Sequence, residues 1–244
     1  IVIDGGPAGV FKQSLQPRLE GLRTNRAPTG ALDIRLLMVS HIDDDHIRGV
    51  LDLTRELVQA EEDNAAAPFD ITTLWHNSFD DLVKSVKVAN LDVLATRAKS
   101  SNGLDPASRA VPASVPQGRD LRNAAKKLGL NINAHFGDLV VCPAQGKKTV
   151  DLGSGLSFTV IGPRQAQIDA LQNDWAKKIA ALKKKGALKP AAMEAVAADF
   201  VDKSVYNLSS IVVLAEAGGH RMLLTGDARG DYILEGLKAG GLLK

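Results

Sequence analysis

Apolar positions along the chain form short runs that alternate with amphipathic stretches of helical period. Apolar runs closed by turn residues predict buried strands at 1–4, 35–40 and 71–75. Apolar side chains at helical spacing predict helices over 47–60 and 79–99. The proline-containing stretch 101–118 has few large apolar side chains and predicts a surface loop, followed by a short basic helix at 119–129.

The second part of the chain is expected to contain hairpins. Further apolar runs predict short strands at 131–135, 139–141, 148–152 and 156–162. Gly-Ser-Gly at 153–155 joins the last two runs into a hairpin, and Gly218-Gly219 joins another pair, 210–217 and 220–226. A final helix is expected at about 230–239. This order favours an α+β fold with two packed mixed sheets and helices outside them.

Composition narrows the class of protein. The chain has 244 residues, 45% apolar and 24% charged, which is typical of a globular protein and fits a single domain over 1–244. The longest uncharged stretches, 152–163 and 204–215, are too short to cross a bilayer, so we expect no membrane contact and a cytoplasmic location. The single cysteine, Cys142, excludes an internal disulfide framework and an all-cysteine metal site.

A helical, Ala- and Lys-rich segment at 164–206 is expected as an insertion, with a break at 186–190 between two helices. The net charge of +2 gives no global field for nucleic acid, but this segment is basic. Its lysines could follow a phosphate backbone, or they could be the solvated face of an Ala-rich helix. The lysines concerned are Lys177, Lys178, Lys183, Lys184 and Lys185.

The strongest chemical signal is His41-Ile42-Asp43-Asp44-Asp45-His46, directly after an apolar strand. Two imidazoles and three carboxylates this close together are costly to desolvate unless a cation compensates them. In extended chain, His41, Asp43 and Asp45 would share one face and His46 would turn away. Imidazole with carboxylate suits zinc, manganese or iron, so we expect metal binding. The alternative is a solvated acidic turn that caps a helix.

Several motifs occur in one order along almost the whole chain. Besides the cluster at 41–46, they are the opening strand 1–6, the hairpin 151–163, the Asn-Leu-Ser-Ser segment 207–210 and Leu-Leu-Thr-Gly-Asp-Ala at 223–228. Together they resemble the metallo-β-lactamase fold superfamily, and most closely the metallo-β-lactamase domain of bacterial ComEC-type DNA-uptake proteins and similar stand-alone hydrolases. The superfamily pattern is H-x-H-x-D-H, and this branch commonly has Asp at the second His position, as the chain has at Asp43.

This resemblance implies an αββα sandwich with two divalent metal ions, zinc or manganese. His41 and Asp43 would bind one ion, Asp45 and His46 the other, and Asp227 would bridge them. Asp45 is the carboxylate best placed to orient the attacking water. By itself, Asp227 at a strand end reads as a turn residue.

Other side chains are candidates for the cleft or for supporting the ligands. Asp4 looks like a strand-end Asp beneath the metal loop. His76 either lines the cleft or packs under Trp75, and the packing role is favoured. The remaining candidates, which would orient phosphate or cap a strand, are Asn207, Ser209 and Ser210.

The function that follows from the resemblance is phosphodiester hydrolysis, as a nuclease on DNA or as another phosphodiesterase. Two alternatives stay open: a non-catalytic or conditionally active module of a defence, uptake or signalling assembly, and a hydrolase of small esters, thioesters or lactones. The ends look truncated, and the His-His-Gly-Ser segment of ComEC-like domains does not occur before Lys244. The cut ends and the 164–206 insertion are therefore expected surfaces for a protein partner.

Overall fold

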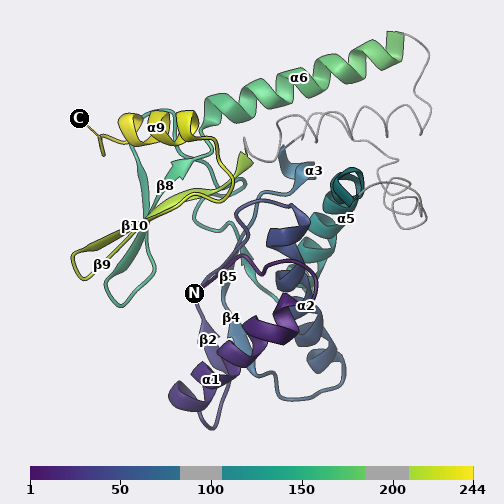
Figure 1. Ribbon diagram of the computed structural model, residues 1–244, viewed down its shortest axis with the longest axis vertical. Coiled ribbons are helices and arrows are strands. Elements are labelled where there is room, and N and C mark those ends of the chain that lie inside the picture. The colour runs from purple at the N-terminus through teal and green to yellow at the C-terminus, as the bar shows by residue number, and fades with distance from the viewer. Residues whose placement is uncertain (83–105, 185–208, 244) are drawn as a thin grey trace.

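The computed structural model describes residues 1–82, 106–184 and 209–243 (Figure 1). The fold is mixed α/β, with helices and with both parallel and antiparallel sheets. The expected combination of helices with more than one sheet is therefore confirmed. Among the described residues, no helix has both the length and the apolarity that a bilayer span requires.

One four-stranded sheet is parallel and has the order β1-β3-β5-β6. Its strands are β1 (Val2–Ile3), β3 (Leu37–Met38), β5 (Thr73–Trp75) and β6 (Asn131–Ile132). Leu37 pairs with Val2 on one side and with Leu74 on the other. The predicted strands here are confirmed but are shorter than expected. A separate parallel pair is formed by β2 (Leu32–Ile34) and β4 (Phe69–Ile71).

The second four-stranded sheet is antiparallel and has the order β10-β9-β8-β7. Its strands are β7 (Lys148–Asp151), β8 (Leu156–Gly162), β9 (Val212–Ala217) and β10 (His220–Leu224). Both predicted hairpins are confirmed, because β7 pairs with β8 and β9 with β10. Residues 139–141, which the structure describes, form no named strand; the next residue, Cys142, makes only an isolated bridge to Arg164.

The two four-stranded sheets share a core. Met38 and Trp75 of the parallel sheet belong to the same buried cluster as Phe158 and Val160 of the antiparallel sheet. The Trp75 ring, which is fully buried, lies edge-on to Phe136 and Phe158 with centroid distances of 5.1 and 6.1 Å. Such aromatic contacts add to the free energy gained by burying apolar area.

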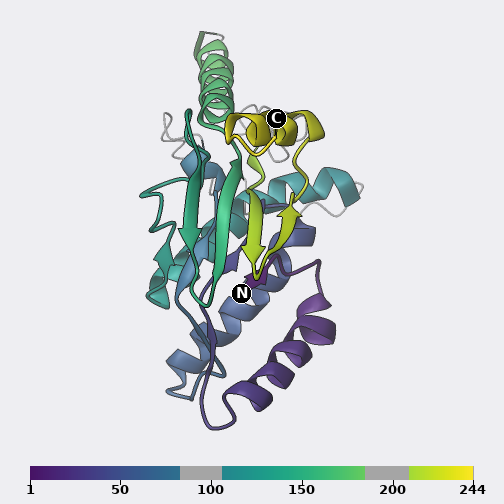
Figure 2. The ribbon, with the colours of Figure 1, turned by 90° about the vertical axis from the view of Figure 1, so that its left-hand side faces the viewer.

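Helices cover the outer side of each sheet. The parallel sheet shares a core with α2 and α5, through Ile47, Leu51 and Leu121 among others. On the antiparallel sheet, Ile233 and Leu237 of α9 pack against a cluster that contains Val212. In Figure 2, α9 is the yellow helix beside the C-terminus, next to one end of this sheet. The helices described are the π-helix η1 (Phe11–Leu15), α1 (Gln16–Arg26), α2 (Asp44–Glu62), α3 (Phe79–Leu82), α5 (Pro106–Lys127), α6 (Gln165–Lys184) and α9 (Gly230–Ala239).

The structure describes the predicted segments 79–99, 101–118 and 164–206 only in part. The prediction of a loop over 101–118 is wrong for its described part, because α5 starts at Pro106 and continues through the predicted basic helix. Leu121 and Ala125 of α5 are fully buried and pack in the core with α2, and this tertiary contact outweighs the low helix propensity of proline. Of the helix at 79–99, only α3 lies in the described residues; of the 164–206 insertion, only its N-terminal part, including α6, does.

Candidate metal centre

The candidate site lies at the carboxyl ends of β1 and β3, where both strands run out of the parallel sheet. Asp4 follows β1, and Ser40 and His41 follow β3. Parallel neighbours end at the same edge of a sheet, so the strand pairing itself brings these side chains together. The Asp4 amide N–H donates to the Met38 carbonyl at 2.8 Å and thereby extends the pairing to the site.

Helix α2 begins inside the acidic motif. Asp43 is its N-cap, with extended φ and ψ of −67° and 148°, and Asp44, Asp45 and His46 form its first turn. The expectation that His41, Asp43 and Asp45 share a face of extended chain is therefore wrong. The helical turn instead brings His46 back towards His41, and the two ring centroids are 3.9 Å apart. Acidic residues at this position also complement the helix dipole.

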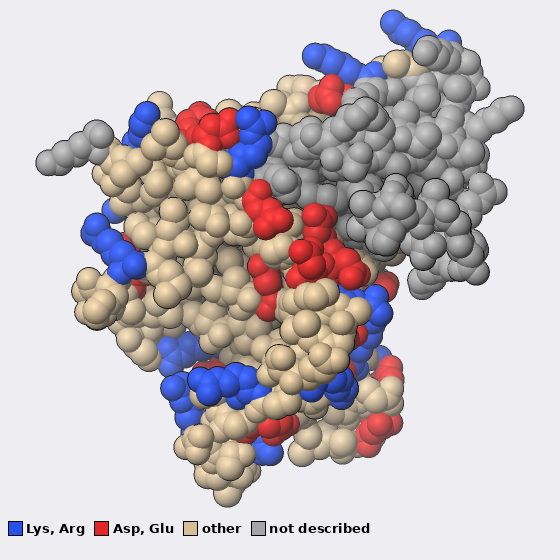
Figure 3. Space-filling view, in the orientation of Figure 1, with Lys and Arg blue, Asp and Glu red and all other residues tan. Residues whose placement is uncertain are grey.

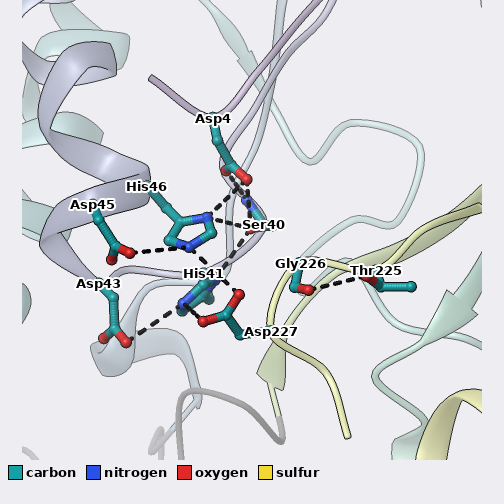
Figure 4. Close-up of polar contacts among 9 residues, drawn as sticks. All are labelled: Asp4, Ser40, His41, Asp43, Asp45, His46, Thr225, Gly226 and Asp227. Carbon is teal, nitrogen blue, oxygen red and sulfur yellow. Dashed lines mark hydrogen bonds and ion pairs between the residues drawn. The ribbon is translucent and has the colours of Figure 1, made fainter. Parts of the chain in front are cut away.

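Asp227 reaches the two imidazoles from the loop between β10 and α9 (Figure 4). Its Oδ1 lies 3.6 Å from His46 Nε2, and its Oδ2 lies 3.7 Å from His41 Nε2. One ligand atom from each of His41, His46 and Asp227 lies within 4.8 Å of the others, which is close enough for one metal ion. The other two aspartates lie on separate sides, Asp43 Oδ2 at 3.4 Å from His41 Nε2 and Asp45 Oδ2 at 3.7 Å from His46 Nε2.

The donor set suits a metal ion. His41 Nε2 is buried and has no hydrogen-bond partner among the described residues, although it faces two carboxylates. A buried polar atom without a partner is costly, and a cation at this point would remove that cost. Imidazole nitrogen with carboxylate oxygen is the ligand combination of zinc and manganese sites. The residues present therefore fit the metal that the sequence predicted.

A glycine permits Asp227 to approach. Gly226 has φ +49°, and a Cβ built on it would lie 2.9 Å from both Cβ and Oγ of Ser40. Any larger residue would be strained in this conformation and would also press on Ser40. Gly226 thus carries the β10–α9 loop close to the end of β3.

Asp4 and Ser40 contact the imidazoles from the side opposite Asp43 and Asp227 (Figure 4). Asp4 Oδ1 accepts the Ser40 amide N–H at 2.7 Å, and its Oδ2 accepts from the Ser40 hydroxyl at 2.8 Å and from His46 Nδ1 at 2.9 Å. Asp4 has φ +54°, an unusual backbone conformation for a residue other than glycine. The structure places it behind His46 and outside the group of ligand atoms.

The charge around His46 favours a cation. Burial lowers the pKa of His46, but the hydrogen bond to Asp4 and the charges of Asp4, Asp45 and Asp227 together outweigh it, so the pKa is raised above 6.5. The same carboxylates that favour a proton on His46 would favour a metal ion beside it. Acidic side chains also gather near the middle of the face shown in Figure 3.

Two glycines bring β1 and α2 close enough for these bonds. A Cβ on Gly49 would lie 2.0 Å from the Gly5 carbonyl oxygen, and a Cβ on Gly5 would lie 2.2 Å from the Val50 nitrogen. The Gly5 N–H donates to the His46 carbonyl at 2.7 Å, and the Gly49 N–H donates to the Gly6 carbonyl at 3.0 Å. This close approach is what puts Asp4 within reach of His46.

The other predicted site residues lie around this group. His76 is 1% exposed, and its Nε2 lies 3.5 Å from the Cβ position of Gly118 on α5. Among the described residues, the rings that contact Trp75 are those of Phe136, His135 and Phe158. His76 is not one of the clustered ligand atoms. Ser209 and Ser210 are buried, and the Ser210 side chain lies 3.5 Å from the Cβ position of Gly226.

The structure describes only some of the lysines that were predicted to contact a phosphate backbone. Lys177 and Lys184 are exposed on α6. The side chains of Lys178 and Lys183 are not described, and Lys185 and Asn207 lie outside the described residues.

Sequence reasoning missed two residues that contact the motif. Ser40 contacts Asp4 and both imidazoles, and its position directly before His41 was the available signal. Gln117, 6% exposed on α5, donates to Asp44 Oδ1 at 2.6 Å, so Asp44 has a protein partner, which the alternative of a solvated acidic turn did not include. No local pattern could have indicated this contact, because the segment containing Gln117 was predicted to be a loop.

Comparison of the chain with protein-family models, with curated proteins and with solved structures finds no match.

Proposed function

We propose that the chain is a metal-dependent hydrolase whose metal centre is built on His41, His46 and Asp227. The observation that carries the proposal is the buried His41 Nε2, which lacks a hydrogen-bond partner among the described residues and faces the Asp227 carboxylate. The second oxygen of the same carboxylate faces His46 Nε2. A cation held between these nitrogens and carboxylate oxygens would give the buried nitrogen a partner.

We infer two divalent ions, zinc or manganese, from the way the aspartates pair with the histidines. Asp43 lies beside His41, Asp45 lies beside His46, and Asp227 offers one oxygen to each side. This arrangement supports the ligand set implied by the resemblance to the metallo-β-lactamase superfamily. The shared core between the sheets, with helices packed outside each, likewise supports an αββα sandwich of that kind.

Each residue has a separate task in the proposed reaction. Bound divalent ions would lower the pKa of water and polarise the oxygen of a scissile phosphoryl or carbonyl group. The side chain of Asp45 is 64% exposed and that of Asp227 is 50% exposed, so solvent and substrate can reach their carboxylates. Asp45 would orient the attacking water through a carboxylate oxygen and accept its proton. The buried imidazole of His41 and the Asp4-bound imidazole of His46 would stay fixed during the reaction.

The substrate class we propose is a phosphodiester, with DNA as the first candidate. The resemblance to ComEC-type domains supports this choice. The exposed Lys177 and Lys184 of α6 add basic side chains that can contact phosphate groups.

Metal analysis combined with a hydrolysis assay tests the proposal. The chain is dialysed against zinc or manganese, its metal content is measured, and turnover of single-stranded DNA and of bis-(p-nitrophenyl) phosphate is followed with and without chelator. We expect bound metal, chelator-sensitive hydrolysis, and a loss of at least about 100-fold in Asp45→Ala. Asp63→Ala, at the opposite end of the same helix, is the matched control and should keep full activity.

The other outcomes distinguish the alternatives. A chain that binds no metal and hydrolyses nothing would overturn the proposal. Turnover of esters, thioesters or lactones without phosphodiester turnover would move the chain to the small-molecule hydrolases. Stoichiometric metal with no hydrolysis of any of these substrates would favour a non-catalytic module.

A further inference from the structure

The Ser40 hydroxyl stands between three acceptor or donor atoms of the candidate centre. Its Oγ lies 2.8 Å from Asp4 Oδ2, 3.1 Å from His41 Nδ1 and 3.2 Å from His46 Nδ1. Ser40 is 2% exposed. A hydroxyl has one proton to donate and two lone pairs that accept, so it cannot donate to all three atoms.

The proton of Ser40 is best placed on the bond to Asp4. This is the shortest of the three contacts, and a hydrogen bond to a carboxylate is stronger than one to a neutral imidazole. Once Ser40 has donated to Asp4, its lone pairs can only accept. A hydrogen bond between Ser40 Oγ and His41 Nδ1 then requires the proton to be on Nδ1.

We propose that Ser40 is a positioning residue that fixes the Nδ1–H tautomer of His41 and so leaves the lone pair of Nε2 directed at Asp43 and Asp227. In a neutral imidazole one nitrogen carries the proton and the other carries the lone pair, and the partner of one nitrogen decides the state of the other. Nε2 is the buried atom without a hydrogen-bond partner among the described residues. That Nε2 then binds a metal ion rests on the proposed function, whereas the tautomer does not.

His46 provides an internal comparison. Its Nδ1 contacts Ser40, but it also donates to Asp4 Oδ2 at 2.9 Å. Among the described residues, His41 Nδ1 has only Ser40 as a hydrogen-bond partner. Loss of the Ser40 hydroxyl should therefore release the tautomer of His41 and leave that of His46 in place.

Nitrogen-15 NMR of the metal-free chain at about pH 9 tests the proposal. Resonances are assigned with His41→Asn and His46→Asn. We expect both imidazoles of the wild-type chain to carry the proton on Nδ1. An Nε2–H form of His41 in the wild-type chain would overturn the proposal.

Ser40→Ala removes only the oxygen. We expect His41 to become a mixture of tautomers while His46 keeps its Nδ1 proton; an unchanged His41 would overturn the proposal. Thr54→Val is the matched control, because Thr54 is also buried and its hydroxyl bonds only to carbonyl groups of α2 among the described residues. This variant should leave both imidazoles unchanged, which separates the tautomer effect from the general loss of a buried hydroxyl.

Zinc titration tests whether Ser40 also affects metal binding. We expect Ser40→Ala to bind zinc about 10- to 100-fold more weakly than the wild-type chain, as is common when a residue that orients a metal-bound histidine is removed. Equal zinc affinity in the two chains would overturn the role of Ser40 at a metal centre. A wild-type chain that binds no zinc but shows the Nδ1–H tautomer of His41 would overturn the proposed function and leave the tautomer assignment standing.

Discussion

Gly5 and Gly49 touch through their backbones, and neither has room for a side chain. A Cβ on Gly49 would lie 2.0 Å from the Gly5 carbonyl oxygen. The contact joins the end of β1 to α2 one turn beyond the motif at 41–46, and it keeps the Asp4 carboxylate 2.9 Å from His46 Nδ1. Two residues without side chains therefore control the distance between two residues of the candidate centre.

Gly49→Ala tests this contact. Alanine in a helix normally stabilises relative to glycine, but here the added methyl group meets fixed backbone, so we expect the free energy of unfolding to fall by about 1–3 kcal/mol. Gly21→Ala in α1 is the matched control, since nothing lies within 4 Å of its Cβ position, and it should raise stability by about 0.5–1 kcal/mol. Urea denaturation measures both. Equal effects of the two substitutions would contradict the close approach.

Zinc should stabilise the chain against heat, because an ion that binds only the native state shifts the unfolding equilibrium. At a free concentration of about 100 times Kd the gain is about 2.7 kcal/mol, or roughly 5–10 °C in Tm for a chain of this size. Asp227→Asn should lose most of this shift. Asp231→Asn removes a nearby aspartate that pairs with Arg229 and should retain the shift. Differential scanning calorimetry measures the zinc-induced change in Tm of each variant. A change of equal size in both would exclude Asp227 as a ligand.

His76 should make the chain sensitive to acid. Burial lowers the pKa of His76 to about 4, with the charges of Asp81 and Arg122 acting in opposite directions on it. An unfolded chain, with an ordinary pKa of 6.5, binds more protons than the native one between these values. Stability is therefore lost as the pH falls from about 6.5 to about 4, by about 3 kcal/mol in total.

The measurement is urea denaturation of wild type and His76→Phe at a series of pH values. The variant should lose less stability than wild type over this pH range, whatever its stability at pH 8. If the two curves run parallel, another group is responsible for the acid sensitivity.

The Gln117–Asp44 bond should stabilise the fold more than a similar bond on the surface does. Gln117 is 6% exposed, so Gln117→Ala leaves a cavity and removes the amide partner of Asp44; we expect a cost of about 1–3 kcal/mol. Gln59 makes the same kind of bond to Asp63 but is exposed, so Gln59→Ala should change stability by less than about 0.5 kcal/mol. Thermal denaturation of both variants gives the comparison, and similar costs would show that burial of this bond adds little.

Local patterns in the sequence predicted the hairpins and α9 well. The turn of the β9–β10 hairpin is Gly218-Gly219, both with positive φ, and its geometry is set by a few neighbouring residues. The helix α5 was missed for the opposite reason. Its prolines argue locally against a helix, and the packing of Leu121 and Ala125 in the α2 core is a tertiary effect that no short pattern contains.

The sequence indicated which residues form the candidate site better than it indicated how they are arranged. His41 and His46 stand in one motif, and Asp227 was added through a family resemblance. Extended chain was the wrong expectation for Asp44, Asp45 and His46, because α2 begins at Asp44 whereas the apolar pattern that predicts the helix begins only at Ile47. The contacts of Ser40 with both imidazoles depend on strand pairing, which the sequence did not reveal.

The loop that carries Asp227 has a consequence for how the protein is assembled. His41 and His46 follow a strand of the parallel sheet, whereas Asp227 follows the last strand of the antiparallel sheet. The three side chains can meet only after both sheets have formed and docked. During synthesis the N-terminal residues are made first. His41 and His46 would therefore emerge long before Asp227 is made. We therefore expect the proposed metal ion to bind late in folding. Its binding would then show that the two sheets have docked.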